Sequence, residues 1–256
     1  MNCIVIDIGN SSIKVGLSRS GRIMRVSRLP GGTRDRDTID EALMATLGRT
    51  RIEGAVISSV VPANTGIWRT RIKKLVGYHP LLVGHGVKLG LKISHPNSVT
   101  IGGDRLANAS GAFARYGAPV IIADFGSALT FDVISRKCEY IGGVIAPGLP
   151  LMTDYLAEKT ALLPRVRLAG PCATVGASTA GAIRIGARIG YRGIVREVVQ
   201  HLRNDHRIRG ASLCATGGYA KLVLSGLDMP FHHDPHITLF GLSRIFELNA
   251  SSAESP

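Results

Sequence analysis

The sequence predicts an α/β fold of two duplicated halves, each ordered strand, strand, strand, helix, strand, helix, with a ligand cleft between them. Three observations predict it. The 256 residues, 45% hydrophobic and 19% charged, are enough to bury a core and are not typical of disordered, collagenous or coiled-coil chains. Short apolar runs alternate with segments of helical spacing. The pattern of residues 4–16 recurs at 121–133, so that Asp124 corresponds to Asp7, 117 positions earlier.

The first half, residues 1–117, contains strong turn and cap signals. Gly9 and Gly21 separate its first three strands, Pro62 ends the fourth, and Asp37 or Thr38 caps the first helix. In chain order the expected elements are strands over 3–8, 13–17 and 23–29, a helix over 37–47, a strand over 55–61, a helix over 64–76, a short strand over 81–83 and a helix over 105–116.

The second half, residues 118–250, begins after the boundary at Ala118 and Pro119 and repeats this order. A loop is expected around His232–His236, before a last helix, and residues 251–256 are expected to be a frayed tail. In chain order the other expected elements are two strands within 121–133, a strand over 140–145, a helix after 149, a helical stretch over 184–209 and a strand over 212–216.

The composition limits which kinds of partner and which cellular compartment we expect for the protein. The net charge of +13 suits either a nucleic-acid or membrane-surface binder or an enzyme with anionic substrates. The densest basic stretch, 184–209, alternates with apolar residues and predicts a solvated helix face, which disfavours a nucleic-acid partner. No apolar run is long enough for a membrane helix, and the chain enters a strand at once, which argues against a signal peptide. The four cysteines form no C-x-x-C pair, so we expect free thiols in the cytoplasm; they are Cys3, Cys138, Cys172 and Cys214.

The first chemical motif is the turn after the first strand. Asp7 ends an apolar strand, Gly9 allows a tight turn, and the amides of residues 10–12 can point into one concavity. Such a turn can hold a phosphate, with Asp7 holding Mg²⁺ through water. An ordinary Asp-Gly hairpin is the alternative, but the second copy at Asp124 favours a binding role. Since the chain has no G-x-x-x-x-G-K-[ST] segment, the paired turns would hold a nucleotide.

The second motif is Gly102-Gly103-Asp104-Arg105 at a helix start. The glycines permit close approach to a ligand, an Asp in a kinase can accept the proton of an attacking hydroxyl, and an Arg can grip a carboxylate. A surface ion pair is the alternative. The glycine-rich segments 140–148 and 215–219 are equally compatible with ligand walls and with plain tight turns, and the histidines form no metal-binding pattern.

Taken in order, these motifs resemble those of type III pantothenate kinases, within the sugar kinase and actin-like ATPase superfamily, over nearly the whole chain. They are Asp7-Ile8-Gly9-Asn10-Ser11, Ser58-Ser59-Val60-Val61-Pro62, Gly102-Gly103-Asp104-Arg105, Asp124-Phe125-Gly126-Ser127-Ala128-Leu129-Thr130, Gly142-Gly143-Val144-Ile145-Ala146-Pro147-Gly148, Thr160-Ala161-Leu162-Leu163-Pro164, Thr179 with Gly186, Thr216-Gly217-Gly218 and Leu239-Phe240-Gly241-Leu242.

The resemblance implies an actin-like (ribonuclease H-like) fold and ATP-dependent phosphorylation of pantothenate to 4'-phosphopantothenate, the first step of coenzyme A synthesis. It implies a cytoplasmic homodimer that requires K⁺ or NH₄⁺ and uses Mg²⁺ with ATP. The small residues 107–113 are expected to serve helix packing at the dimer contact. Two other functions stay open, namely a kinase of another small alcohol and a non-catalytic regulatory or nucleic-acid-binding protein that keeps the fold.

The resemblance also implies roles for individual residues. Asp104 matches the proton acceptor, and Asp124 matches the ligand of the monovalent cation. The substrate-binding positions are His95, Gly102, Gly103, Asp104, Arg105 and Thr179. The ATP-binding positions are Asp7, Ile8, Gly9, Asn10, Ser11, Ser12, Ile13, Lys14 and Ser127. The chain departs from the family pattern where Ser11 and Ser127 replace Thr, His95 replaces Tyr and Ser98 replaces Pro.

Overall fold

The computed structural model describes residues 1–170 and 173–250, which form two compact units. The first unit contains Met1–Ala118, Lys137–Gly142 and the described residues from His236 onward. The second contains Pro119–Arg136 and Gly143–Pro235.

These units differ from the predicted halves in the place of the last helix. The first boundary falls at residue 118, next to the expected one, but α7 (Ile237–Ala250) belongs to the first unit rather than to the second. The reason is packing, because α7 contacts α3 (Gly103–Tyr116) and β1 (Asn2–Ile8) of the first unit. The tail expected over 251–256 lies outside the described residues.

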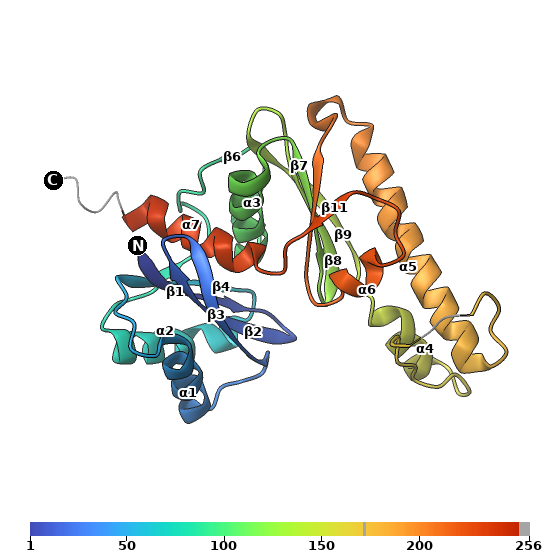
Figure 1. The fold of residues 1–256 in the computed structure, drawn as a ribbon, viewed down its shortest axis with the longest axis horizontal. Helices are drawn as coiled ribbons and strands as arrows, with labels where there is room; N and C mark the ends of the chain where they lie inside the picture. The colour runs from blue at the N-terminus through green and yellow to red at the C-terminus, as the bar shows by residue number, and fades with distance from the viewer. Residues whose placement is uncertain (171–172, 251–256) are drawn as a thin grey trace. The chain divides into compact units, whose positions relative to one another are not determined.

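The first unit is built on a five-stranded sheet in the order β3-β2-β1-β4-β5. Strand β2 is antiparallel to β1 and β3, whereas β4 and β5 continue the sheet in parallel. Helices α1 and α2 cover one face of this sheet, and α7 lies against the other (Figure 1). The remaining bounds are β2 (Ser12–Arg19), β3 (Arg22–Pro30), β4 (Gly54–Ser59), β5 (Leu81–Leu82), α1 (Arg36–Leu47) and α2 (Pro62–Val76).

Alternation along β1 sorts its side chains between the two faces. Ile4, Ile6 and Ile8 join the buried cluster with Leu43 of α1 and Trp68 of α2. Residues 3, 5 and 7 therefore point to the opposite face, where Cys3 lies 3.9 Å from the Ser243 hydroxyl of α7. This alternation places Asp7, the acidic residue of the strand, on the face away from α1 and α2.

The helix caps differ in detail from the sequence-based expectation. Helix α1 is capped by Asp35, not by Asp37 or Thr38, because the Asp35 carboxylate accepts a hydrogen bond of 2.9 Å from the Thr38 amide. Pro62 lies at the first position of α2, where the missing N–H costs nothing.

Helices α3 and α7 cross at very short range inside the first unit. A Cβ on Gly111 would lie 2.6 Å from the Ile237 carbonyl oxygen, and a Cβ on Gly241 would overlap the Ala107 carbonyl oxygen. The Thr238 hydroxyl of α7 donates to the Asn108 side chain of α3 at 2.7 Å. The small residues 107–113 therefore serve helix packing, and the helix on which they pack is α7 of the same chain.

The sheet of the second unit repeats the topology of the first. Its order is β11-β10-β7-β8-β9, so reading from β9 reproduces the sequence β3-β2-β1-β4-β5. The short strand β6 (Lys92–Ile93) pairs with Glu139 and Tyr140 of β9, residues that belong to the first unit. The bounds are β7 (Val120–Phe125), β8 (Ala128–Ile134), β9 (Glu139–Pro147), β10 (Ser212–Thr216) and β11 (Phe231–His233). The loop expected at His232 forms β11, because parallel pairing with β10 extends the sheet.

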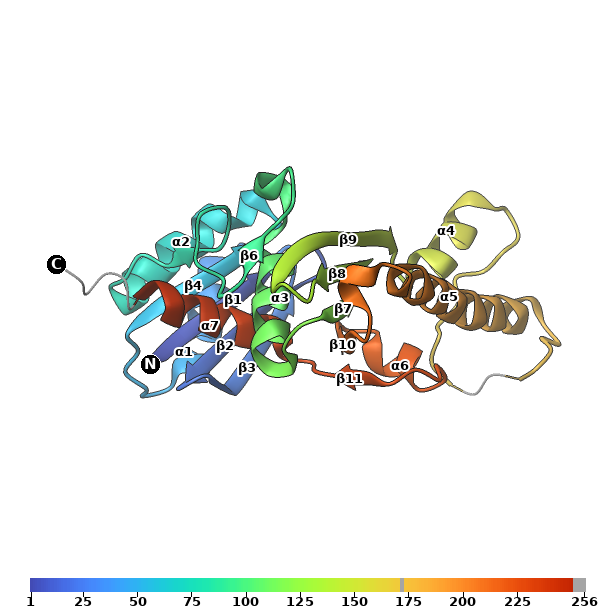
Figure 2. The same cartoon turned by 90° about the horizontal axis from the view of Figure 1, so that it is seen from above.

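The helical part of the second unit is dominated by α5 (Thr179–Arg203), which packs on α4 (Leu151–Lys159) and α6 (Ala220–Leu224) (Figure 2). Three arginines at spacing four on α5 donate to main-chain carbonyls. Arg184 bonds Arg167 O, Arg188 bonds Leu168 O and Gly170 O, and Arg192 bonds Val223 O. The basic stretch is thus not simply a solvated face, because these guanidinium groups tie neighbouring segments to the helix.

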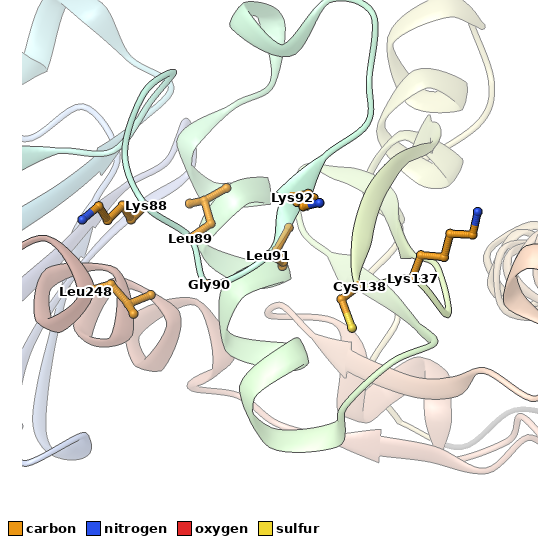
Figure 3. Close-up of a pocket in the computed structure, with 8 residues that line it drawn as sticks. All are labelled: Lys88, Leu89, Gly90, Leu91, Lys92, Lys137, Cys138 and Leu248. Carbon is orange, nitrogen blue, oxygen red and sulfur yellow. The ribbon is translucent and has the colours of Figure 1, made fainter.

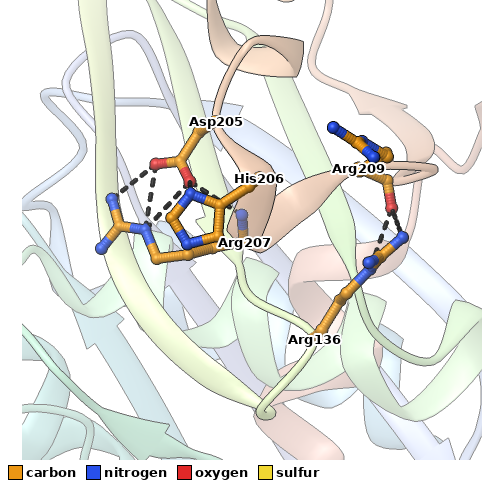
Figure 4. Close-up of polar contacts among 5 residues, drawn as sticks. All are labelled: Arg136, Asp205, His206, Arg207 and Arg209. Carbon is orange, nitrogen blue, oxygen red and sulfur yellow. Dashed lines mark hydrogen bonds and ion pairs between the residues drawn. The ribbon is translucent and has the colours of Figure 1, made fainter.

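A second group of arginines fixes the segment that follows α5 (Figure 4). The Arg136 guanidinium donates twice to the Arg209 carbonyl oxygen. The carboxylate of Asp205, before the short 3₁₀ helix His206–Ile208, accepts from the Arg207 guanidinium and amide, which lowers the pKa of Asp205 to about 2. The other 3₁₀ helix of the described chain is Ser98–Thr100 in the first unit.

The described cysteines are all free thiols. Cys3 and Cys214 are buried and Cys138 is half-buried, whereas Cys172 lies outside the described residues. Within residues 1–170 and 173–250, the helices are all too short or too polar to cross a membrane.

Candidate active site

Asp7 is the second-last residue of β1 and is buried, with 8% of its surface exposed. Lys14 is its cross-strand partner on β2, and the Lys14 Nζ lies 3.6 Å from Asp7 Oδ2. The Gly9 amide donates to the Ser12 carbonyl at 3.0 Å and closes the turn between the two strands. The turn therefore presents a carboxylate and an ammonium side by side, a pair that can serve a metal ion and a phosphate respectively.

The predicted ATP-binding segment divides by side-chain direction. Ile8 and Ile13 are fully buried in the cluster under α1 and α2, so only their main chain could meet a nucleotide. Asn10 and Ser11 are exposed and Ser12 is half-buried. The side chains available to a ligand in this segment are consequently polar.

The segment after β3 packs against this turn, a contact that the sequence did not predict. The chain after β3 passes so close to the turn that a Cβ on Gly31 would overlap the Asn10 carbonyl oxygen. The Gly31 amide donates to the Ser11 carbonyl at 3.1 Å, and the Asn64 side chain of α2 donates to the Gly31 carbonyl at 2.6 Å. Only glycine allows this approach.

The same crossing recurs in the second unit. A Cβ on Gly148 would overlap the Ser127 carbonyl oxygen, as Gly31 does with Asn10. Both glycines follow a proline, Pro30 or Pro147, and they are separated by the 117 positions that separate Asp7 from Asp124. This repeated Pro-Gly pair is the signal by which the crossing could have been found in the sequence.

Asp124 ends β7 in the second unit between two threonines. Its register partners are Thr130 on β8 and Thr216 on β10. Thr216 is fully buried, and within the described part of the chain its hydroxyl has no hydrogen-bond partner. Gly217 has a φ of +95°, and a Cβ there would lie 2.5 Å from Asp124 Oδ1. Asp124 and Thr216 thus bring oxygen atoms together at one end of the sheet, where Ser127 is exposed in the following turn.

The two glycines before Asp104 are required by its geometry. Helix α3 begins at Gly103, so Asp104 and Arg105 lie in its first turn, as the sequence predicts. A Cβ on Gly102 would lie 2.5 Å from Asp104 Oδ1, and one on Gly103 would lie 2.9 Å from the Val83 carbonyl oxygen. The Asp104 carboxylate also accepts from the Arg105 amide at 2.8 Å. The glycines leave room for a carboxylate that the first turn of the helix holds in place.

The remaining predicted substrate residues lie in different units. His95 is in the first unit, where its Nδ1 accepts from the Asn97 amide at 3.2 Å. Its ring packs against Gly142, whose Cβ position would be 3.4 Å from the His95 Cδ2. Thr179 is the exposed first residue of α5 in the second unit, after the N-cap Ser178. The structure thus brings Asp7 and Lys14 together, and it places Thr179, Asp124 and Ser127 in the second unit.

A hollow elsewhere in the first unit contains none of the predicted site residues. It measures about 510 Å³ and is lined by Leu89, Leu91 and Leu248 together with lysines 88, 92 and 137 (Figure 3). Across residues 1–170 and 173–250, no three His, Cys, Asp or Glu side chains gather as metal ligands. A divalent ion would therefore depend on one carboxylate and on the ligand's own oxygens, an arrangement that Mg²⁺ commonly takes with phosphates.

Comparison with known proteins identifies relatives along the whole chain. The model of the type III pantothenate kinase family matches residues 3–201. A type III pantothenate kinase of Akkermansia muciniphila is 41% identical over 97% of this chain and 100% of the relative. Enzymes of the same name from Geobacter sulfurreducens and Moorella thermoacetica are 35% and 34% identical over 96% of this chain and 98% and 99% of the relatives.

Solved structures share the fold at low sequence identity. A ROK family glucokinase of Streptomyces griseus, solved with glucose and AMPPNP, aligns with a TM-score of 0.55 at 16% identity, covering 98% of this chain and 100% of that one. Component A of (R)-2-hydroxyglutaryl-CoA dehydratase from Acidaminococcus fermentans aligns with a TM-score of 0.57 at 12% identity, covering 99% and 100%. These similarities confirm the predicted α/β fold of the actin-like ATPases and sugar kinases.

Proposed function

The chain belongs to the type III pantothenate kinase family, and we propose that it transfers the γ-phosphoryl group of ATP to pantothenate. The product is 4'-phosphopantothenate, and the reaction is the first step of coenzyme A synthesis. The observation that carries the proposal is the 41% identity to a type III pantothenate kinase over 97% of the chain. Phosphoryl transfer requires little covalent chemistry from the protein, so the roles of its residues are positioning and electrostatic stabilisation.

In this proposal, Asp104 accepts the proton of the pantothenate hydroxyl as that oxygen attacks. Its carboxylate is held on the first turn of α3, and Gly102 and Gly103 leave space beside it. Arg105 follows on the same turn and grips the substrate carboxylate. His95, packed on Gly142, forms a wall of the pantothenate site, and Thr179 adds a further contact.

The turn after β1 binds the phosphates of ATP. Lys14 pairs with a phosphate oxygen, and the main chain of residues 8–13 with Asn10, Ser11 and Ser12 lines the turn. Ser127 is a further proposed nucleotide contact. Asp7 is placed to hold the hydrated Mg²⁺ that accompanies ATP, and the ion offsets the negative charge of the phosphates.

Asp124 is the proposed ligand of K⁺ or NH₄⁺. The buried Thr216 hydroxyl beside it is a second oxygen suited to a hard cation, which supports the assignment. When bound, the cation would supply positive charge beside the Asp124 carboxylate. Gly217 keeps a side chain away from the Asp124 carboxylate.

A homodimer is the proposed assembly, and exposed apolar side chains of the second unit support it. Tyr155 of α4 is 57% exposed, Ile189 of α5 63% and Leu162 between the helices 90%. Large apolar side chains with this exposure are candidates for an interaction site. We place the enzyme in the cytoplasm, where the free thiols of the described chain would remain reduced.

The test is turnover of ATP by the purified chain against a panel of small alcohols. We expect product with pantothenate, and with K⁺ or NH₄⁺ present but poorly with Na⁺ alone. Faster turnover of another alcohol would identify a different kinase, and no turnover in any salt would favour a regulatory protein that keeps the fold. Equal rates in all three salts would remove the cation role from Asp124.

A further inference from the structure

Ser58, near the end of β4, carries a hydroxyl that nothing in the described chain satisfies. The residue is fully buried, and its Oγ has no hydrogen-bond partner among the described residues. Its neighbour Ser59 differs sharply, because that hydroxyl accepts from the Val61 amide at 3.2 Å and from the Thr65 hydroxyl at 2.8 Å. Leaving a buried hydroxyl unpaired reduces stability, so an unpaired one next to a candidate site invites a functional explanation.

The sheet register places Ser58 beside Asp7. The two residues are partners on the parallel strands β4 and β1, and partners in register project from the same face. That face is the one opposite the α1 and α2 cluster, since Ile57 and Ile6 point into the cluster. Lys14, Asp7 and Ser58 therefore form one row across three adjacent strands.

The start of α3 closes over this row at Ser58. A Cβ on Gly103 would lie 3.3 Å from the Ser58 Oγ, so the helix that carries Asp104 rests directly on the hydroxyl. Bulk water cannot satisfy the hydroxyl, because its Oγ has no accessible surface. Within the row, Asp7 is the hydrogen-bond acceptor next to Ser58.

A bound phosphate would weaken the ion pair between Asp7 and Lys14. The Lys14 ammonium is 3.6 Å from the Asp7 carboxylate, and a bound phosphate would compete for the same ammonium. We propose that Ser58 is a positioning residue for the phosphate-binding turn, and that its hydroxyl donates a hydrogen bond to the Asp7 carboxylate when Lys14 turns to a bound phosphate. The inference rests on the proposed function, because it assumes that a phosphate-bearing ligand binds this turn.

The experiment compares Ser58→Ala with Ser59→Ala in the full chain. Thermal unfolding is measured without ligand and with ATP and Mg²⁺ in the absence of pantothenate, and steady-state kinetics follow. Ser58→Ala should leave the Tm of the free protein unchanged or higher, since it removes an unpaired hydroxyl. It should shrink the rise in Tm caused by ATP and Mg²⁺ and increase the KM for ATP about tenfold, the scale of a lost hydrogen bond to a charged group. The KM for pantothenate should stay within about twofold of the parent.

Ser59→Ala should show the opposite pattern. Its hydroxyl bonds at the start of α2, so the free protein should lose Tm while the rise caused by ATP and Mg²⁺ and the KM for ATP stay as in the parent. Ser58→Cys, which keeps a weak donor of similar size, should give a KM for ATP between those of the parent and Ser58→Ala.

Two results would overturn the inference. One is a Ser58→Ala variant whose KM for ATP and ligand-induced rise in Tm equal those of the parent. The other is a Ser58→Ala variant that loses Tm without ligand as Ser59→Ala does, which would make the hydroxyl structural. The proposed function fails separately, if the parent binds ATP and Mg²⁺ but phosphorylates no pantothenate; the thermal measurements on Ser58 still decide the inference in that case.

Discussion

Asp104 depends on the absence of side chains from its two preceding neighbours. Its carboxylate lies where a Cβ on Gly102 would be 2.5 Å from Oδ1, and Gly103 lies against Val83 and Ser58. The carboxylate accepts from the Arg105 amide at 2.8 Å. At the scale of single residues, the glycines therefore matter because they have no side chain, and the acid accepts its hydrogen bond from the main chain.

Replacing Asp104 by Asn keeps the shape of the side chain and removes the proposed proton acceptor. A general base contributes about 10²–10⁴-fold to rate, so we expect kcat of Asp104→Asn to fall by about that factor. The rise in Tm caused by ATP and Mg²⁺ should stay near the parent value, which controls for misfolding. Turnover above half the parent rate would exclude Asp104 as the base.

The buried thiol of Cys3 should make the free energy of unfolding decrease at alkaline pH. Burial against α7 raises the pKa of the Cys3 thiol from 9.0 to about 12. Between these values the unfolded chain has lost the proton that the folded chain keeps, so the free energy of unfolding falls as pH rises above about 9. At pH 10.5 this costs the parent about 2 kcal/mol relative to pH 8, a loss that Cys3→Ala should escape.

Urea unfolding of the parent and Cys3→Ala at pH 8 and at pH 10.5 measures this difference. The variant should be less stable than the parent at pH 8, where it leaves a cavity, and should close that gap at pH 10.5. The same gap at both pH values would show that the Cys3 thiol does not titrate differently in the folded chain.

At the scale of elements, the two units share a detailed feature, the close approach of Gly31 to Asn10 and of Gly148 to Ser127. In each unit a proline and a glycine after the third strand carry the chain against the turn that follows the first strand. The turns themselves are not identical, because Asp7 pairs with Lys14 whereas Asp124 pairs with Thr130, which makes the first turn one residue longer. Only the first thereby acquires a lysine beside its carboxylate.

Gly31 and Gly32 form a matched pair for testing the crossing. Gly31→Ala would push a Cβ into the Asn10 carbonyl and should destabilise the protein by about 1–3 kcal/mol while raising the KM for ATP. Gly32→Ala meets nothing within 4 Å and should be neutral or slightly stabilising. Urea unfolding and ATP kinetics on both variants measure the difference; equal behaviour would mean that the loop yields and that the close approach has no role.

At the scale of the whole molecule, the exposed apolar side chains on α4, α5 and the segment between them call for a partner. Three of the arginines of α5 donate to carbonyl oxygens of the same unit, and the exposed apolar side chain of Ile189 lies on the same helix. This distribution favours a second copy of the chain over a polyanion as the partner of this surface.

Charge placed on that surface should separate the dimer. We expect the parent to sediment as a dimer at micromolar concentration and the double variant Tyr155→Glu, Ile189→Glu to sediment as a monomer, because carboxylates would be buried unpaired at the contact. Met24→Glu, at a side chain 53% exposed on β3 of the first unit, is the matched control and should leave the dimer intact. A dimer that survives the double change would place the contact elsewhere.

The sequence by itself determined the duplicated strand order, the α/β class and the family, because apolar periodicity, Asp-x-Gly turns and ordered motifs are local features that survive without tertiary information. Asp7, Asp104 and Asp124 could be proposed as site residues for the same reason, since each lies near the end of a strand or at the start of a helix, next to glycine. The helix cap at Asp35 and the strand at His232 were missed, because each depends on a partner chosen during folding.

Only the tertiary structure decided which partners those elements take. Helix α7 joins the first unit because Gly111 and Gly241 let two helix backbones meet, a fit that neither helix encodes alone. The sequence predicts that the arginines of α5 lie on a solvated face. In the structure, three of them donate hydrogen bonds to carbonyl oxygens, because residues 167–170 and Val223 are distant in the chain and adjacent in space. Ser58 belongs to a motif that the sequence shares with the family, but the register of the sheet decides that it lies beside Asp7, and packing places Gly103 over its hydroxyl. Periodicity predicts which face a residue occupies, but the identity of its neighbour is set by long-range packing.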